Sequence, residues 1–170
     1  MANNYAVVRL DRVTGTTDGA KLLSARYYVS TAATDIQNGN VVHFTNELLD
    51  RELFKTTAPT ANDTIDTVGL VASVELIKDG SVLVDDLTDF INKADGEPQR
   101  VYLLETGDIF SVTAPAINNL PATVANAKGN YVKLGTTTKW EYTTVAADGV
   151  GTIIDVEVVG TKTYFVIRIK

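Results

Sequence analysis

The sequence has no cysteine, a single histidine and only four prolines among its 170 residues. Without cysteine there is no disulfide bond, no thiol nucleophile and no zinc–thiolate site. The one imidazole, His43, is flanked by β-forming residues, and we interpret it as lining a strand rather than acting as a base. The chain contains neither a Gly-x-Ser-x-Gly nucleophile motif nor a glycine-rich phosphate loop. These absences predict a protein that is not an enzyme and needs no cofactor.

Basic residues are also in short supply. Lysine and arginine together number 15 against 21 acidic residues, which gives a net charge of −6 and an isoelectric point of about 4.7. Proteins that bind duplex nucleic acid neutralise its phosphates with basic side chains, so this balance argues against such a role. The apolar runs are far shorter than the roughly 18 residues of a membrane span, and the first residues lack a signal-peptide pattern. We expect neither a nucleic-acid partner nor a membrane partner.

What the sequence does contain is apolar and β-branched residues. Hydrophobic residues make up 45% of the chain, and threonine and valine are abundant. Such residues favour pleated sheets, and pairs such as Asn38-Gly39 supply tight turns between strands. The pattern predicts an all-β fold, mainly an antiparallel barrel or sandwich, in a single domain over residues 1–170. We expect a flexible N-terminal arm at about residues 1–5 and extended loops at residues 57–66 and 113–128.

The clearest local pattern is a hairpin at the end of the chain. Apolar and polar residues alternate over residues 153–159, and a second β-rich run covers residues 162–169. Between them, Gly160-Thr161 suits a type II′ turn because glycine takes a positive φ at its first central position. With this turn, the predicted cross-strand contacts are Val156 facing Phe165, Ile154 facing Ile167, and Asp155 diagonal to Arg168.

Further strands are expected over residues 5–10, 26–29, 41–44, 68–75, 101–104, 108–112, 131–134 and 138–145. One short helix is expected near residues 86–93, capped by Asp85 or Asp86, because Leu87, Phe90 and Ile91 have helical spacing. Residues 46–55 fit either a helix or a strand, since their apolar residues satisfy both periodicities.

Two groups of residues have a chemical interpretation beside a structural one. Asp85, Asp86 and Asp89 would suit a hard cation, but acids in the first turn of a helix also complement its dipole, and we favour that interpretation. The aromatic residues also have two interpretations. If they are exposed they could form a sugar-binding platform, and if they are buried they pack in the core. These aromatic residues are Tyr27, Tyr28, Trp140, Tyr142 and Tyr164.

Several stretches from residue 38 onward resemble small β-rich head or capsid-decoration proteins of bacteriophages. They are β-structure signatures and contain no chemical motif. The stretches are LFKTTAP (53–59), VGLVAS (68–73), DFIN (89–92), RVYLLETGDIFSV (100–112), GNYV (129–132) and YFVI (164–167). The resemblance implies a virion protein on the capsid surface, made in the host cytoplasm and bound to the lattice of the major capsid protein.

We therefore expect a decoration protein that stabilises the head lattice, with a homo-oligomer such as a trimer as its binding unit. The alternatives are another virion component, such as a tail or head-completion protein, and a carbohydrate-binding β-sandwich module. The N-terminal arm and the loop at residues 113–128 are the expected contact regions. The candidate contact residues are Ala2, Asn3, Asn4, Tyr5, Pro115, Asn118 and Asn119.

Overall fold

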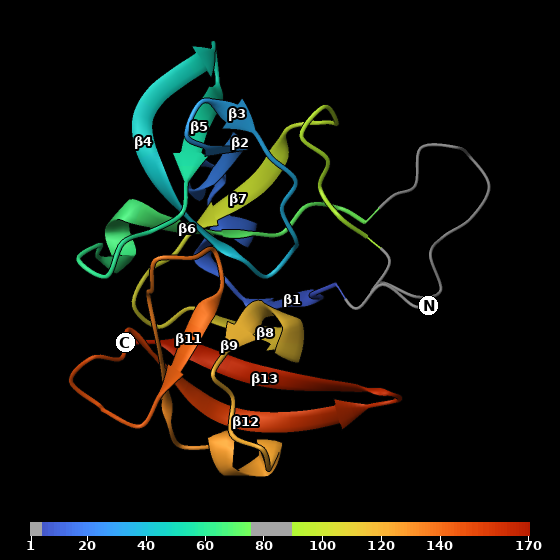
Figure 1. Ribbon diagram of the computed structural model, residues 1–170, viewed down its shortest axis with the longest axis vertical. Coiled ribbons are helices and arrows are strands. Elements are labelled where there is room, and N and C mark those ends of the chain that lie inside the picture. The colour runs from blue at the N-terminus through green and yellow to red at the C-terminus, as the bar shows by residue number, and fades with distance from the viewer. Residues whose placement is uncertain (1–4, 76–89) are drawn as a thin grey trace.

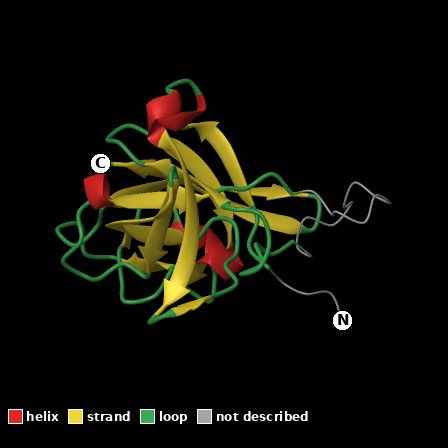
Figure 2. Cartoon of the chain, turned by 90° about the horizontal axis from the view of Figure 1, so that it is seen from above, coloured by secondary structure: helices red, strands yellow, loops and turns green. Residues whose placement is uncertain are grey.

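The computed structural model describes residues 5–75 and 90–170, and it has the predicted all-β fold. In this described part of the chain, thirteen strands form two curled sheets, which are joined by short 3₁₀ turns and loops (Figures 1 and 2). The strands are β1 (Val8–Arg12), β2 (Leu22–Val29), β3 (Ala32–Ala33), β4 (Val41–Asp50), β5 (Leu53–Thr57), β6 (Val68–Val71), β7 (Gln99–Leu103), β8 (Ile109–Thr113), β9 (Ile117–Asn118), β10 (Tyr131–Lys133), β11 (Trp140–Thr143), β12 (Gly151–Val159) and β13 (Lys162–Ile169).

The seven-stranded sheet forms the lower half of Figure 1 and has the order β1-β8-β13-β12-β10-β11-β9. All of its neighbours are antiparallel except β9 and β11, which run parallel. The long connection from β9 to β11, which includes β10, makes this parallel pairing possible, because parallel strands require a crossover. The sheet therefore has two edges, β1 and β9.

The other sheet closes on itself. Strand β2 pairs with β5 on one side and with β7 on the other, so Ala25 lies opposite both Phe54 and Gln99. The ring runs β2-β5-β4-β6-β7 and returns to β2, while β3 attaches to the end of β2. Closure removes the open edges that would otherwise expose unpaired backbone groups. The predicted choice between barrel and sandwich is thus resolved as a small barrel packed on a curled sheet.

A hydrophobic cluster joins the barrel to the seven-stranded sheet. It takes Val41, Leu70 and Tyr102 from barrel strands, and Phe110 and Phe165 from the facing sheet. A second, smaller cluster lies with the barrel strands and includes residues of β2, β4, β6 and β7. The two sheets therefore share one core, and the barrel has an additional core of its own.

The C-terminal hairpin forms at the predicted turn, and part of its predicted register is wrong. Val156 lies opposite Phe165 as expected, and Gly160 has a φ of 59°. Between Ile153 and Asp155, however, β12 contains a bulge, so Ile153 rather than Ile154 faces Ile167. The bulge inserts one extra residue, which turns the preceding side chains to the opposite face.

The expected charge pair of this hairpin is replaced by another. Asp155 lies opposite Val166, as counting from the turn predicts, but its carboxylate accepts a hydrogen bond from Lys128 at 2.7 Å. Lys128 follows the 3₁₀ turn Val124–Ala127, which packs on β12. The ion pair of Asp155 is therefore with Lys128 and not with Arg168.

Three other predictions are refined by the structure. Residues 86–89 of the expected helix lie outside the described residues, and Phe90–Lys93 are not helical, because Asn92 forms a β-bridge with Ile36. The ambiguous residues 46–55 are strand, divided between β4 and β5. The loop at residues 113–128 contains β9 and two 3₁₀ turns, and its Ala116 and Ala127 are fully buried.

None of the helical segments in residues 5–75 and 90–170 has the length and apolar character needed to cross a membrane.

Candidate binding surfaces

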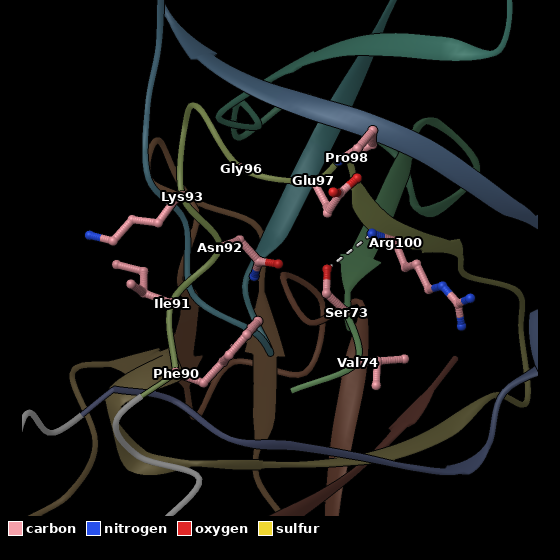
Figure 3. A pocket seen from close by; sticks show the side chains of 10 residues that line it. All are labelled: Ser73, Val74, Phe90, Ile91, Asn92, Lys93, Gly96, Glu97, Pro98 and Arg100. Atoms are coloured by element: carbon pink, nitrogen blue, oxygen red, sulfur yellow. Dashed lines mark hydrogen bonds between the residues drawn. The ribbon is translucent and has the colours of Figure 1, made fainter. Parts of the chain in front are cut away.

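A cavity of about 500 Å³ opens beside the barrel, where the chain leaves β6 and where it enters β7 (Figure 3). Phe90 and Ile91 form one wall, and Val74 and the backbone of Arg100 form the other, with Asn92 between them. Its lining is mainly apolar with a few polar groups, which is typical of ligand pockets of this size. The other residues that line it are Ser73, Lys93, Gly96, Glu97 and Pro98.

A buried network of amides holds the walls of this cavity together. The Asn38 side chain, which is 0% exposed, donates to the Ser73 carbonyl oxygen at 3.0 Å and to the Glu75 carboxylate at 3.2 Å. Its own oxygen accepts from the Ser73 N–H and from the Asn92 side chain, both at 3.0 Å. Asn92 also donates to the Ile36 carbonyl oxygen. Every hydrogen-bonding atom of the Asn38 amide is therefore occupied, so the network fixes the local backbone.

The turn at residues 94–96 lies above the cavity, and hydrogen bonds from residues in and next to the barrel hold it in place. The Arg26 guanidinium donates to the carbonyl oxygens of Ala94 and Gly96. The Asp35 carboxylate accepts from Lys93 and from the Ala94 N–H, each at 2.8 Å, and these contacts lower the pKa of Asp35. The wall that Phe90 and Ile91 form is thus anchored at its C-terminal end by two charged residues.

Glu75 is the one acid in this network whose pKa is raised. Burial disfavours its charged form, and the Asn38 amide and the attraction of Lys162 offset that effect only in part. The folded protein therefore holds a proton on Glu75 at pH values where the unfolded chain has released it. The stability that Glu75 contributes falls as the pH rises from its ordinary pKa of 4.5 through the raised value.

We expect the Glu75→Gln variant to be more stable than the wild type at pH 7, because glutamine keeps the acceptor for Asn38 and carries no buried charge. The difference in unfolding free energy between the variant and the wild type should shrink toward zero at pH 4, where the Glu75 carboxyl is also neutral. Urea unfolding at both pH values measures it. Glu52→Gln, at an exposed position, is the control and should show no such difference. Equal stability of Glu75→Gln and wild type at pH 7 would contradict the expected effect of burial.

The predicted contact residues divide into three groups. Ala2, Asn3 and Asn4 lie outside the described residues, and Tyr5 is half-buried. The chain after Tyr5 is not an arm, because Ala6 and Val7 are buried and Val7 exchanges hydrogen bonds with Thr113.

Pro115 lies in the 3₁₀ turn Ala114–Ala116, directly after the Thr113 that bonds to Val7. Asn118 is elsewhere, opposite Glu141 in β11, and its amide donates to the Thr137 hydroxyl. Asn119 is exposed, with a φ of 62°. The structure therefore bonds the chain after Tyr5 to the start of the second predicted region at Thr113, and it places Asn118 beside β11.

Sequence reasoning did not identify Val158, the most exposed large apolar residue among residues 5–75 and 90–170, which lies with the exposed Val159 at the end of the C-terminal hairpin. The hairpin extends beyond the ends of the neighbouring strands (Figure 1), and near its turn Val158 is 72% exposed and Val159 is 52% exposed. Apolar surface at such a protruding end is accessible to a partner protein, and covering it would remove it from water. A signal was present in the sequence: two consecutive valines directly before a two-residue turn, where one of them has no core to face.

The residues considered for chemistry have structural positions. His43 lies on β4, with its Nδ1 3.3 Å from the Asp63 carboxylate. Trp140 is fully buried and donates its indole N–H to the Gly39 carbonyl oxygen at 3.0 Å. Tyr27 and Tyr164 are also buried, so these three side chains are not available to stack on a sugar.

Asp85, Asp86 and Asp89, for which the sequence favours a helix-dipole role over a cation site, lie outside the described residues. Within residues 5–75 and 90–170, no three acidic or histidine side chains are grouped as metal ligands.

A scan of protein-family models, a search of curated proteins and a search of solved structures found no match to this chain.

Proposed function

We propose that this protein is a structural component of a bacteriophage virion, a decoration protein that binds and stabilises the lattice of the major capsid protein. The proposal rests on the sequence resemblance described above and, in the structure, on the apolar end of the β12–β13 hairpin. Val158 and Val159 leave much of their apolar surface in water there. Covering that surface with a partner would be favourable, since apolar area removed from water contributes about 25 cal/mol per Å².

The hairpin is suited to such a contact because its base is rigid. Strands β12 and β13 are paired along their length, and β13 is also paired with β8. On the inner face, Phe165, Ile167 and Ile169 are buried in the shared core. A rigid base lowers the entropy lost when the exposed end binds a partner.

We propose that several copies act together, with a homo-oligomer such as a trimer as the binding unit. A single small hairpin end provides much less than the roughly 1,200–2,000 Å² of a stable pairwise interface. Linking several such contacts raises the overall affinity by about 10²–10⁴ without new contacts. This arrangement restrains an assembled shell and has little effect on isolated subunits. Sedimentation of the purified protein measures its oligomeric state.

We expect the wild-type protein to bind emptied, expanded heads much more tightly than soluble capsid subunits, because its full set of contacts exists only after assembly. The Val158→Asp/Val159→Asp double variant should bind the heads about tenfold more weakly or worse, since it places charge in the apolar contact. Co-sedimentation at equal subunit concentration measures both.

Val145→Asp is the matched control, because Val145 is 51% exposed in a different loop. It should bind like the wild type. Equal affinity for heads and soluble subunits would contradict a decoration role. Tight binding to a glycan array without binding to heads would favour the carbohydrate-binding alternative.

A further inference from the structure

Two arginines lie on the same outer face of the seven-stranded sheet. Arg12 on β1 and Arg168 on β13 are both directly opposite Ile109 on the strand between them, β8. Residues opposite each other in neighbouring strands project to the same face, and two strand spacings separate the Arg12 and Arg168 backbones by about 10 Å. Both side chains are exposed, and the side chain of Ile109 lies between them.

Two bulges bring about this arrangement. The register of β1 against β8 shifts between Arg9 and Arg12, and without this shift Arg12 would not lie opposite Ile109. The bulge in β12 leaves Ile154 39% exposed beside the same part of the sheet. Bulges are frequent next to functional sites because they redirect side chains. Here one redirects an arginine and the other exposes an apolar side chain.

These residues line an open hollow of about 930 Å³, in which the acidic and hydroxyl groups are already bonded. The buried Asp108 carboxylate accepts from the Thr14 N–H and hydroxyl and from the Glu105 N–H. Asp11 accepts from the Ser111 hydroxyl. The other residues that line the hollow are Val13, Thr16, Thr17, Thr106 and Gly107.

The two arginines, in contrast, have no ion-pair partner among residues 5–75 and 90–170. The ion pairs nearest to them involve Arg9, which contacts Asp11 at 3.8 Å and Glu157 at 2.7 Å. Acidic residues outnumber basic ones in the chain, yet none of the described acids pairs with Arg12 or Arg168. The hollow thus holds two exposed guanidinium groups outside any ion pair of the described residues, while its two carboxylates, Asp11 and Asp108, accept hydrogen bonds from neighbouring groups.

We propose that this hollow binds an acidic segment of the partner protein, with one carboxylate at each arginine and an apolar group over Ile109 and Ile154. This inference rests on the proposed function, and the partner is the capsid lattice. Guanidinium presents a planar fork of donors that matches a carboxylate. Residues on the same face of an extended segment are about 7 Å apart, and the long arginine side chains can adjust to that spacing from backbones about 10 Å apart. Nucleic acid fits less well, because its phosphates would continue beyond these two contacts over an acidic protein, whereas a peptide segment needs only two carboxylates.

The test compares the binding of three variants to expanded heads. The Arg12→Gln/Arg168→Gln double variant should lose about 10–100-fold in affinity, and Arg12→Lys/Arg168→Lys should recover only part of it, since lysine keeps the charge without the fork. Arg51→Gln is the matched control, because Arg51 is an exposed arginine at the turn between β4 and β5. It should bind within about twofold of the wild type. The difference in head-binding affinity between the wild type and the double glutamine variant should shrink as the salt concentration is raised.

A second probe separates this inference from the proposed function. Poly-L-glutamate should shift the side-chain Nε–H resonances of Arg12 and Arg168, and these shifts should be absent at Arg51. If the wild type does not bind heads but shows these shifts, the capsid role fails while the carboxylate site stands. If the wild type and the double glutamine variant bind heads equally well, the site is overturned while the capsid role stands. Tighter binding of a single-stranded DNA oligonucleotide than of poly-L-glutamate would overturn the choice of an acidic protein segment.

Discussion

The Phe165→Ala variant should lose about 3–5 kcal/mol of unfolding free energy, because the change removes buried apolar area and leaves a cavity. Phe165 is 0% exposed and lies opposite Val156 on one neighbouring strand and Val112 on the other. It belongs to the cluster that joins the barrel to the seven-stranded sheet. Since domains of this size are typically stable by about 5–15 kcal/mol, the loss is a large fraction of the total.

Urea unfolding followed by far-UV circular dichroism measures this loss. Val158→Ala, on the same hairpin but 72% exposed, is the control and should change stability by less than about 0.5 kcal/mol. A loss below about 1 kcal/mol for Phe165→Ala would mean that its ring does not fill the shared core.

The Asn38→Ala variant should lose roughly 2–6 kcal/mol of unfolding free energy, although alanine is well tolerated in most turns. The change leaves the Ser73 N–H without its acceptor, and the buried Asn92 amide loses one of its two acceptors and keeps only the Ile36 carbonyl oxygen. Each donor left unsatisfied in this way costs about 1–3 kcal/mol. The Ser73 carbonyl oxygen also loses its donor. Because these groups hold the cavity walls, the chain on either side of the cavity should also exchange its amide hydrogens faster.

Thermal unfolding and hydrogen exchange measure the two effects. Asn118→Ala is the matched control, because its half-buried amide makes one hydrogen bond, at 3.3 Å to the Thr137 hydroxyl. It should lose less than about 1 kcal/mol. If Asn38→Ala were as stable as Asn118→Ala, the amide network would not be what holds the cavity walls in place.

The sequence by itself determined the fold class and the local hairpin. β-branched residues with period-two alternation predict strands wherever they occur, because each strand needs only its own pattern to bury one face. The turn at Gly160-Thr161 was predictable for the same reason, since it depends on the φ of Gly160. The opposition of Val156 and Phe165 follows from that turn by counting along two strands.

The same counting failed two residues farther from the turn, where it predicted Ile154 to face Ile167. The sequence Ile153-Ile154 offers two equivalent apolar side chains, so the local pattern does not indicate which of them faces the core. The structure places Ile153 there and leaves Ile154 in the bulge. That choice depends on packing against β10 and the shared core, not on any residue of the hairpin alone.

The candidate binding surfaces could not be predicted from the sequence either, because they combine residues that are far apart in the chain. Arg12 and Arg168 are far apart in the sequence, and they share a face only because β8 lies between their strands and β1 contains a bulge. Asn38 and Asn92 are 54 positions apart, and neither has a local pattern that marks it as buried. The closed barrel likewise depends on the pairing of β2 with β5 and with β7. Contacts across such distances are chosen by the packing of the whole chain, because local periodicity specifies which face is apolar but not which strand will lie beside it.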